Sequence, residues 1–125
     1  MNKKLIITAA FLGSVAIVLG AFGAHALKKV LDTDALQTFE VGVRYQMYHA
    51  LFLLGVGATP LVTEKTKKTI LWLVSLGVLL FSGSIYLLAT QQALGINFSF
   101  LGPITPIGGL LLIAAWVLLC WKAVQ

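Results

Sequence analysis

Residues 40–49 read Glu40-Val41-Gly42-Val43-Arg44-Tyr45-Gln46-Met47-Tyr48-His49, and they carry most of the polar chemistry of the chain. The stretch continues without a break into the apolar segment from Ala50 to Val62. A charged, aromatic and histidine-bearing face therefore leads directly into a segment that is apolar enough to enter a membrane. This order predicts a small helical bundle arranged around one polar layer.

The composition indicates that lipid is the solvent for much of the protein surface. The chain has 125 residues, of which 59% are hydrophobic and only 10% are charged, and its mean hydropathy is +0.98. Soluble domains average about 25% charged residues. The net charge of +5 does not favour nucleic acid as a partner, because the basic residues form no stripe. The single cysteine, Cys120, excludes an intrachain disulfide.

Four apolar segments are expected to cross the membrane as helices, at residues 5–27, 44–62, 70–90 and 106–121. Each is close to the length of about 20 residues that a bilayer requires. A cleaved signal peptide is the alternative for the first segment, because Ala24-His25-Ala26 resembles a cleavage site. The apolar run exceeds the usual length of about 7–15 residues for a signal peptide, so an uncleaved span is expected. We therefore predict an all-α membrane protein, a four-transmembrane-helix bundle that forms a single membrane domain over residues 1–125.

An amphipathic interfacial helix is expected at about residues 34–43, between the first and second spans. Asp34 is in a suitable position to be its N-cap, with Gln37 three residues later. Phe39 and Val43 then share an apolar face, which is typical of a helix that lies in the membrane interface. This helix either continues into the second span or bends at Gly42.

The other connections are expected to be loops, at residues 63–69 and 91–104. The last span is expected to start at Thr105-Pro106, with the threonine as N-cap and the proline at the first helical position. In the first span, Ala16, Gly20 and Ala24 recur every four residues, a spacing that lets helix backbones approach closely.

The distribution of lysine and arginine predicts that both termini are cytoplasmic. More of these residues lie on the side that holds the termini. That side carries Lys3, Lys4, Lys65, Lys67, Lys68 and Lys122, and the other side carries Lys28, Lys29 and Arg44. Trp72 and Trp121 fall near the cytoplasmic face, where they would act as membrane anchors. Arg44 is expected to be an anchor at the opposite headgroup layer.

This topology predicts a polar layer in the outer leaflet, formed by side chains of three helices. Both histidines are expected about 4.5 Å or slightly more inside the outer boundary. The candidate polar-layer or ligand site comprises His25, Tyr45, Gln46, Tyr48, His49, Ser82, Ser84 and Tyr86. Three interpretations of the layer remain open. It is a proton-coupled or ligand-binding site, a metal or haem site, or a set of hydrogen bonds that hold the helices together.

A metal site has weak support, because two histidines fall short of a metal signature and no Cys, Asp or Glu is spaced to complete the ligand set. No metal and no cofactor are expected. The acidic residues lie outside the spans and form no nucleophile–base–acid arrangement, so we expect no enzyme. The Gly102–Gly109 segment is interpreted as a loop and helix start rather than a phosphate loop.

Four segments, spread over the whole chain, form a recognisable set of motifs. They are Gly20-Ala21-Phe22-Gly23-Ala24-His25, Tyr45-Gln46-Met47-Tyr48-His49, Phe81-Ser82-Gly83-Ser84-Ile85-Tyr86 and Thr105-Pro106-Ile107-Gly108-Gly109. These motifs resemble those of the YgdD/YwdK-like family of small bacterial inner-membrane proteins of unknown function. The resemblance implies a four-span protein of the bacterial plasma (inner) membrane, and it implies no reaction, substrate or catalytic residue.

Two functions follow as hypotheses. The first is a non-enzymatic accessory or assembly component of the membrane, which packs through its Gly/Ala/Ser-rich helix faces against a second copy or a larger complex. The alternative is a small oligomeric transporter or proton-conducting module that uses the His/Tyr layer. Because four spans form a thin wall around a pore, the alternative requires several copies of the chain.

Overall fold

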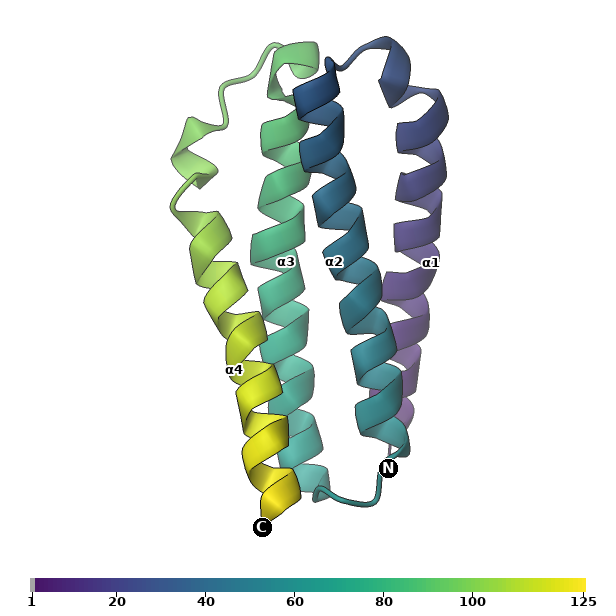
Figure 1. Ribbon diagram of the computed structural model, residues 1–125, viewed down its shortest axis with the longest axis vertical. Helices are drawn as coiled ribbons and strands as arrows, with labels where there is room; N and C mark the ends of the chain where they lie inside the picture. The colour runs from purple at the N-terminus through teal and green to yellow at the C-terminus, as the bar shows by residue number, and fades with distance from the viewer. Residues whose placement is uncertain (1) are drawn as a thin grey trace.

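The computed structural model describes residues 2–125 and consists of four long helices that stand side by side, with both termini at the same end (Figure 1). The helices are α1 (Lys3–His25), α2 (Thr33–Ala58), α3 (Glu64–Leu94) and α4 (Ile104–Val124). Two short 3₁₀ turns, η1 (Leu27–Lys29) and η2 (Ser99–Leu101), lie in the connections at the other end. The described residues contain no strand, which confirms the all-α fold class.

Three segments of the described chain are long and apolar enough to cross a membrane: Lys3–Lys29, Glu64–Leu94 and Ser99–Val124. Helix α2 does not meet the same criteria, because polar and charged residues occupy much of its first half. It nevertheless packs along both α1 and α3, so it occupies the same layer of the molecule as those two helices.

Residues 34–58 lie in one uninterrupted helix, without a bend at Gly42. A separate interfacial helix at residues 34–43 is therefore not confirmed. The helix also ends earlier than the expected second span, because Pro60 follows Ala58 closely and cannot continue a helix. Residues 59–62 belong to the connection to α3.

The helix starts differ from the sequence-based expectations in three places. The N-cap of α2 is Asp32, whose carboxylate accepts a hydrogen bond from the Ala35 backbone N–H at 2.7 Å, so the assignment to Asp34 is wrong. Helix α3 starts at Glu64, capped by the Thr63 hydroxyl, so most of the expected loop at residues 63–69 is helical. Lys65 and Lys68 are exposed there, which suits a solvated first turn as well as a loop, whereas Lys67 is buried.

Helix α4 starts at Ile104 rather than after Thr105, and Pro103 occupies the N-cap position. The Thr105 hydroxyl instead meets the Ser84 hydroxyl of α3 at 2.5 Å. A bond between helices thus replaces the expected cap. At the preceding turn, Gly95 ends α3 with a φ of 69°, a left-handed conformation that glycine adopts without strain.

The helices pack mainly on their neighbours in the chain: α1 on α2, α2 on α3 and α3 on α4. Two apolar clusters form the core. The larger lies toward the termini around Leu53, Ile70 and Val74, and the smaller lies toward the opposite end around Phe39 and Ala89. The buried polar side chains Gln46 and Ser82 lie between the two clusters in the chain order of α2 and α3.

Small residues let these helices approach closely. Gly13, Gly20 and Gly23 of α1 face side chains of α2, and Ala16 is 1% exposed. Gly108 of α4 lies against the α3 backbone, where a β-carbon would collide with the peptide before Phe81. The small residues expected to mediate association therefore pack largely inside the protein.

Candidate functional site

The centre of the polar layer is the side chain of Gln46, which is 4% exposed and joins three helices. Its Nε2 donates to the Leu12 carbonyl of α1 at 2.8 Å, and its Oε1 accepts from the Tyr86 hydroxyl of α3 at 2.7 Å. One turn away, the Ser82 hydroxyl donates to the Gly42 carbonyl at 2.8 Å. These bonds fix the register of α1, α2 and α3.

Gly42 makes the approach of α3 possible, because a β-carbon there would lie 2.6 Å from the Tyr86 ring. The ring of Tyr86 packs against that of Phe39, with 5.1 Å between the centroids. The hydroxyl of Tyr86 is thereby held over the amide of Gln46. No side-chain nitrogen or oxygen buried within residues 2–125 is left without a hydrogen-bond partner.

His49 is 4% exposed and joins α2 to α4. The Trp116 indole N–H donates to His49 Nε2 at 3.0 Å. Because an indole nitrogen can only donate, Nε2 is the acceptor and the proton lies on Nδ1, which donates to the Tyr45 carbonyl at 2.7 Å. Nε2 of a neutral imidazole thus binds the neighbouring helix, and Nδ1 orients the ring by a bond to its own helix.

An aromatic groove lies next to this contact, between α2 and α4. Its volume is about 600 Å³. The lining residues are Tyr45, Tyr48, His49, Leu51, Phe52 and Trp116. The Phe52 and Trp116 rings are 4.0 Å apart between centroids and close the end of the groove toward the termini. The two tyrosines are exposed, so the groove opens to the outside of the protein.

His25 does not belong to this layer. It is exposed at the end of α1, whereas His49 is level with about Ser14, because a β-carbon at Gly13 would lie 3.7 Å from that of its neighbour Ala50. About eleven residues of α1, or roughly 16 Å along the helix, separate the two levels. The expectation that both histidines lie at one depth is wrong, because it placed the outer end of the second span at Arg44, whereas α2 continues for eleven residues before it.

Arg44 also lies deeper than expected. A β-carbon at Gly20 would lie 3.5 Å from the Val43 side chain, so Arg44 is level with about Leu19, roughly 4.5 Å from the middle of residues 5–27. Arg44 is thus level with the middle part of α1 rather than with its end, and its role as a membrane anchor stays a prediction. Its side chain is exposed on the outward face of α2.

The remaining anchors, Trp72 and Trp121, are 67% and 60% exposed near the end that holds the termini. The ammonium of Lys122 lies 5.6 Å from the Trp121 ring centroid. An interfacial position suits both tryptophans, because their amphipathic rings favour the headgroup level. Their role as membrane anchors stays a prediction.

The comparisons with known proteins identify the family. The family model described as a protein of unknown function (DUF423) matches residues 19–109. This chain belongs to the DUF423 family. The match agrees with the resemblance to YgdD and YwdK that the sequence motifs indicate.

Among curated relatives, the UPF0382 membrane protein SH2409 of Staphylococcus haemolyticus is 43% identical over 94% of this chain and 92% of its own length. The UPF0382 membrane protein YwdK of Bacillus subtilis is 40% identical over 98% of each chain. The UPF0382 inner membrane protein YgdD of Escherichia coli is 32% identical over 99% of this chain and 92% of its own. No solved structure matches.

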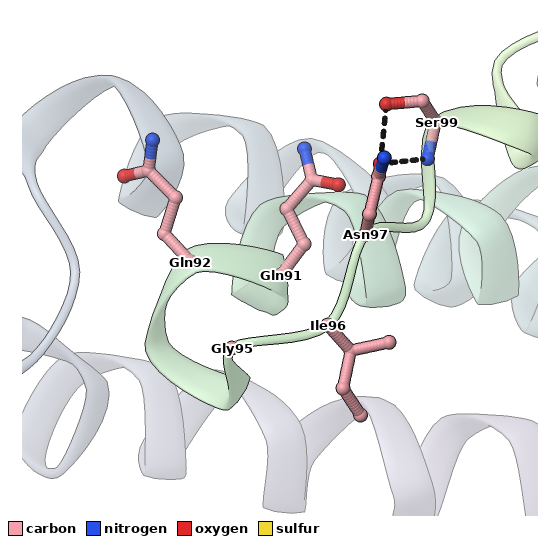
Figure 2. A pocket seen from close by; sticks show the side chains of 6 residues that line it. All are labelled: Gln91, Gln92, Gly95, Ile96, Asn97 and Ser99. Atoms are coloured by element: carbon pink, nitrogen blue, oxygen red, sulfur yellow. Dashed lines mark hydrogen bonds between the residues drawn. The ribbon is translucent and has the colours of Figure 1, made fainter.

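A polar pocket of about 380 Å³ lies at the end of α3 in this DUF423 protein, lined by Gln91, Gln92, Gly95, Ile96, Asn97 and Ser99. Figure 2 shows Asn97 turned toward Ser99, where its side-chain oxygen accepts from the backbone N–H at 2.9 Å and from the hydroxyl at 2.6 Å. Gln91 accepts from the Phe98 backbone N–H at 3.0 Å. These groups hold the loop in shape. No group of three or more His, Cys, Asp or Glu within residues 2–125 is placed to hold a metal ion.

Sequence reasoning missed two partners of the polar layer in the DUF423 chain. Trp116 is one, and its signal was an indole N–H in the middle of an apolar helix, which needs an acceptor where water is excluded. Thr105 is the other, since it bonds to Ser84 rather than capping its helix. Both lie on α4, the helix to which no polar-layer residue was assigned.

Proposed function

We propose that this DUF423 protein is a non-enzymatic component of the bacterial plasma membrane that crosses the bilayer four times, with both termini cytoplasmic. Its task is lateral assembly, and its partner is a second copy of the same chain. The observation that carries this proposal is the position of Arg44, exposed on α2 and level with about Leu19, near the middle of the apolar helix α1.

Two independent contacts support this depth. Relative to α1, Arg44 is level with about Leu19, as derived above. Relative to α3, it lies between the Gly42 contact with Ser82 and the Gln46 contact with Tyr86. An arginine at the centre of a lipid-facing helix costs about 2.5–3.5 kcal/mol on insertion scales. Charged residues in spans therefore usually face protein or water, and an interface would supply that cover.

The outward face of α2 is self-complementary. Glu40, Arg44 and Tyr48 recur every four residues, and all three are exposed. In a two-fold dimer whose axis is perpendicular to the membrane, two copies of α2 would run side by side in the same direction. Glu40 and the arginine of the second copy would then differ by about 6 Å in height, which the long arginine side chain spans. The symmetry makes two equal ion pairs, one on each side of the axis.

The interior of the protein supports a structural task for the polar layer. The side chains of Gln46, His49, Ser82 and Tyr86 bond to neighbouring helices or to their own backbone. The interface for a second copy is accordingly sought on the charged outward face of α2 rather than among the small residues of α1 that already pack inside.

A transport or proton-conducting module is the second candidate function, and the same charged face favours it. Three or more copies around one axis would direct Glu40, Arg44 and Tyr48 toward a shared centre, where water could enter. A dimer would instead bury the ion pairs in a dry contact. The number of subunits therefore separates the two candidates.

Charge reversal tests the assembly. Glu40→Arg and Arg44→Glu should each stop two differently tagged copies of one variant from purifying together, because each change opposes like charges. The two variants should purify with one another, because a mixed dimer restores both pairs. Asp34→Lys, an exposed change near the start of α2, is the control and should associate like the natural chain.

Native mass spectrometry of the natural chain gives the subunit number. Two subunits support the dimer, and a larger ring supports the second candidate. Assembly through this face would be refuted if the natural chain is a monomer and if the two charge-reversal variants, alone or mixed, co-purify no differently from the Asp34→Lys control. If the natural chain is found in complex with one different membrane protein and without a second copy of itself, the choice of partner would be refuted.

A further inference from the structure

A basic pocket of about 440 Å³ lies between the first turns of α1 and α3, at the end of the protein that holds both termini. Its lining residues are Lys3, Lys4, Leu5, Glu64, Lys67, Lys68 and Leu71. Lysines thus outnumber carboxylates around one cavity. Two leucines complete the wall on the side toward the apolar core, where Leu5 is 3% exposed.

Lys67 is the unusual member of the pocket, because its side chain is only 3% exposed. Its Nζ donates to the Asn2 side-chain oxygen at 3.1 Å and to the Gly57 carbonyl at 3.2 Å. The carbonyl belongs to the last turn of α2, where helix carbonyls lack partners and the dipole favours a cation. These contacts explain why the ammonium is directed inward.

Both acceptors of Lys67 are uncharged oxygens, and an ammonium carries a third N–H. A buried charge is costly unless an opposite charge accompanies it. Lys3, Lys4 and Lys68 add three further positive charges around the cavity. The first turns of α1 and α3 add the positive ends of two helix dipoles. The pocket therefore presents a concentrated positive field over an apolar wall.

We propose that this pocket binds the phosphate of an anionic phospholipid headgroup, with an acyl chain of the lipid against Leu71. The single negative charge of the phosphodiester would offset part of the positive charge of the lysines, and the apolar side chain of Leu71 distinguishes a lipid from free phosphate. The site is independent of the α2 face, so it does not rest on the proposed assembly. Basic pockets between membrane helices are suited to such headgroups because the anion and the apolar chain meet at the same depth.

Native mass spectrometry of the full chain, delipidated in mild detergent, tests the site. The probes are dioleoyl phosphatidylglycerol, dioleoyl phosphatidylcholine with the same acyl chains, and inorganic phosphate. The natural protein should retain phosphatidylglycerol in preference to the other two. The pocket variant combines Lys3→Gln, Lys4→Gln and Lys68→Gln, which are exposed positions, and leaves the buried Lys67 in place.

The matched control combines Lys28→Gln, Lys29→Gln and Lys122→Gln, which removes the same charge outside the pocket. Each lysine near an anionic headgroup contributes about fivefold to binding, so the pocket variant should lose at least tenfold in retained phosphatidylglycerol and the control should not. Circular dichroism should show equal helix content in all three proteins.

Three results would overturn the proposal. Equal loss in both triple variants would mean a general charge effect. Equal retention of phosphatidylglycerol and phosphatidylcholine would show that the pocket does not recognise an anionic headgroup. Competition by millimolar inorganic phosphate would assign the site to a free anion.

Discussion

The bond between Tyr86 and Gln46 allows a quantitative test of the polar layer. Tyr86→Phe removes the hydroxyl that donates to Gln46 at 2.7 Å and leaves a buried amide oxygen without a donor. Bonds between membrane helices average about 0.6 kcal/mol and reach about 1.7 kcal/mol, and an unsatisfied buried group adds to that loss. We expect the free energy of unfolding to fall by about 1–2 kcal/mol.

Gln46→Leu should cost more, about 1.5–3 kcal/mol, because it removes the bonds to both Leu12 and Tyr86. The double variant should lose less than the sum of the two single losses, since neither the Gln46 amide oxygen nor the Tyr86 hydroxyl is then present without the other. The expected difference is about 0.6–1.7 kcal/mol.

Reversible unfolding in mixed detergent and sodium dodecyl sulfate micelles, followed by circular dichroism, measures all four proteins. Tyr48→Phe is the control, because the Tyr48 side chain is 49% exposed, and it should unfold like the natural chain. Strict additivity of the Tyr86 and Gln46 changes, or an equal effect of Tyr86→Phe and Tyr48→Phe, would refute the view that this layer holds the helices together.

Three further outcomes are expected. Gly108→Ala should lower the free energy of unfolding by about 1–3 kcal/mol, because the new β-carbon collides with the α3 backbone. Gly109→Ala is the control and should not lower it, since its β-carbon would lie 3.6 Å from the Phe81 ring, an ordinary contact distance. Equal effects of the two changes in the same unfolding assay would contradict the close approach of α4 to α3. Asp32→Ala should lower the free energy of unfolding by about 0.5–2 kcal/mol through loss of the N-cap, which is more than Asp34→Ala should. A larger loss for Asp34→Ala would identify Asp34 as the cap instead. Nitrogen-15 NMR should find His49 protonated on Nδ1 in the neutral form, and a proton on Nε2 would be incompatible with the indole contact.

The helical class and the three apolar spans could be predicted because hydropathy is a local property that needs no partner. The limits of α2 could not, since the apolar pattern places the start of a span at Arg44, whereas the helix follows its cap at Asp32. An amphipathic sequence fits an interfacial helix and a helix packed between two others equally well. Only the contacts with α1 and α3 separate the two cases.

Part of the polar layer was also predictable. Gln46, Tyr86 and Ser82 have side chains that need partners in an apolar setting, and chemistry alone marks them. Their pairing depends on register, which the sequence does not give. The expected span starts at Arg44, eleven residues after the start of α2. This difference shifts every depth along that helix, and it explains why the sequence places His25 and His49 in one layer.

The order of contacts in the bundle has a consequence for how it is made. Each long helix packs chiefly on the one that precedes it in the chain, so no segment must wait for a distant one before it can dock. A ribosome that delivers the helices in order would complete the α1–α2–α3 layer around Gln46 before α4 is synthesised. The last helix would then close on a preformed surface, with Thr105 and Trp116 meeting acceptors that are already in place. Biogenesis of this protein is thereby reduced to a series of local steps, the kind that proceeds fastest.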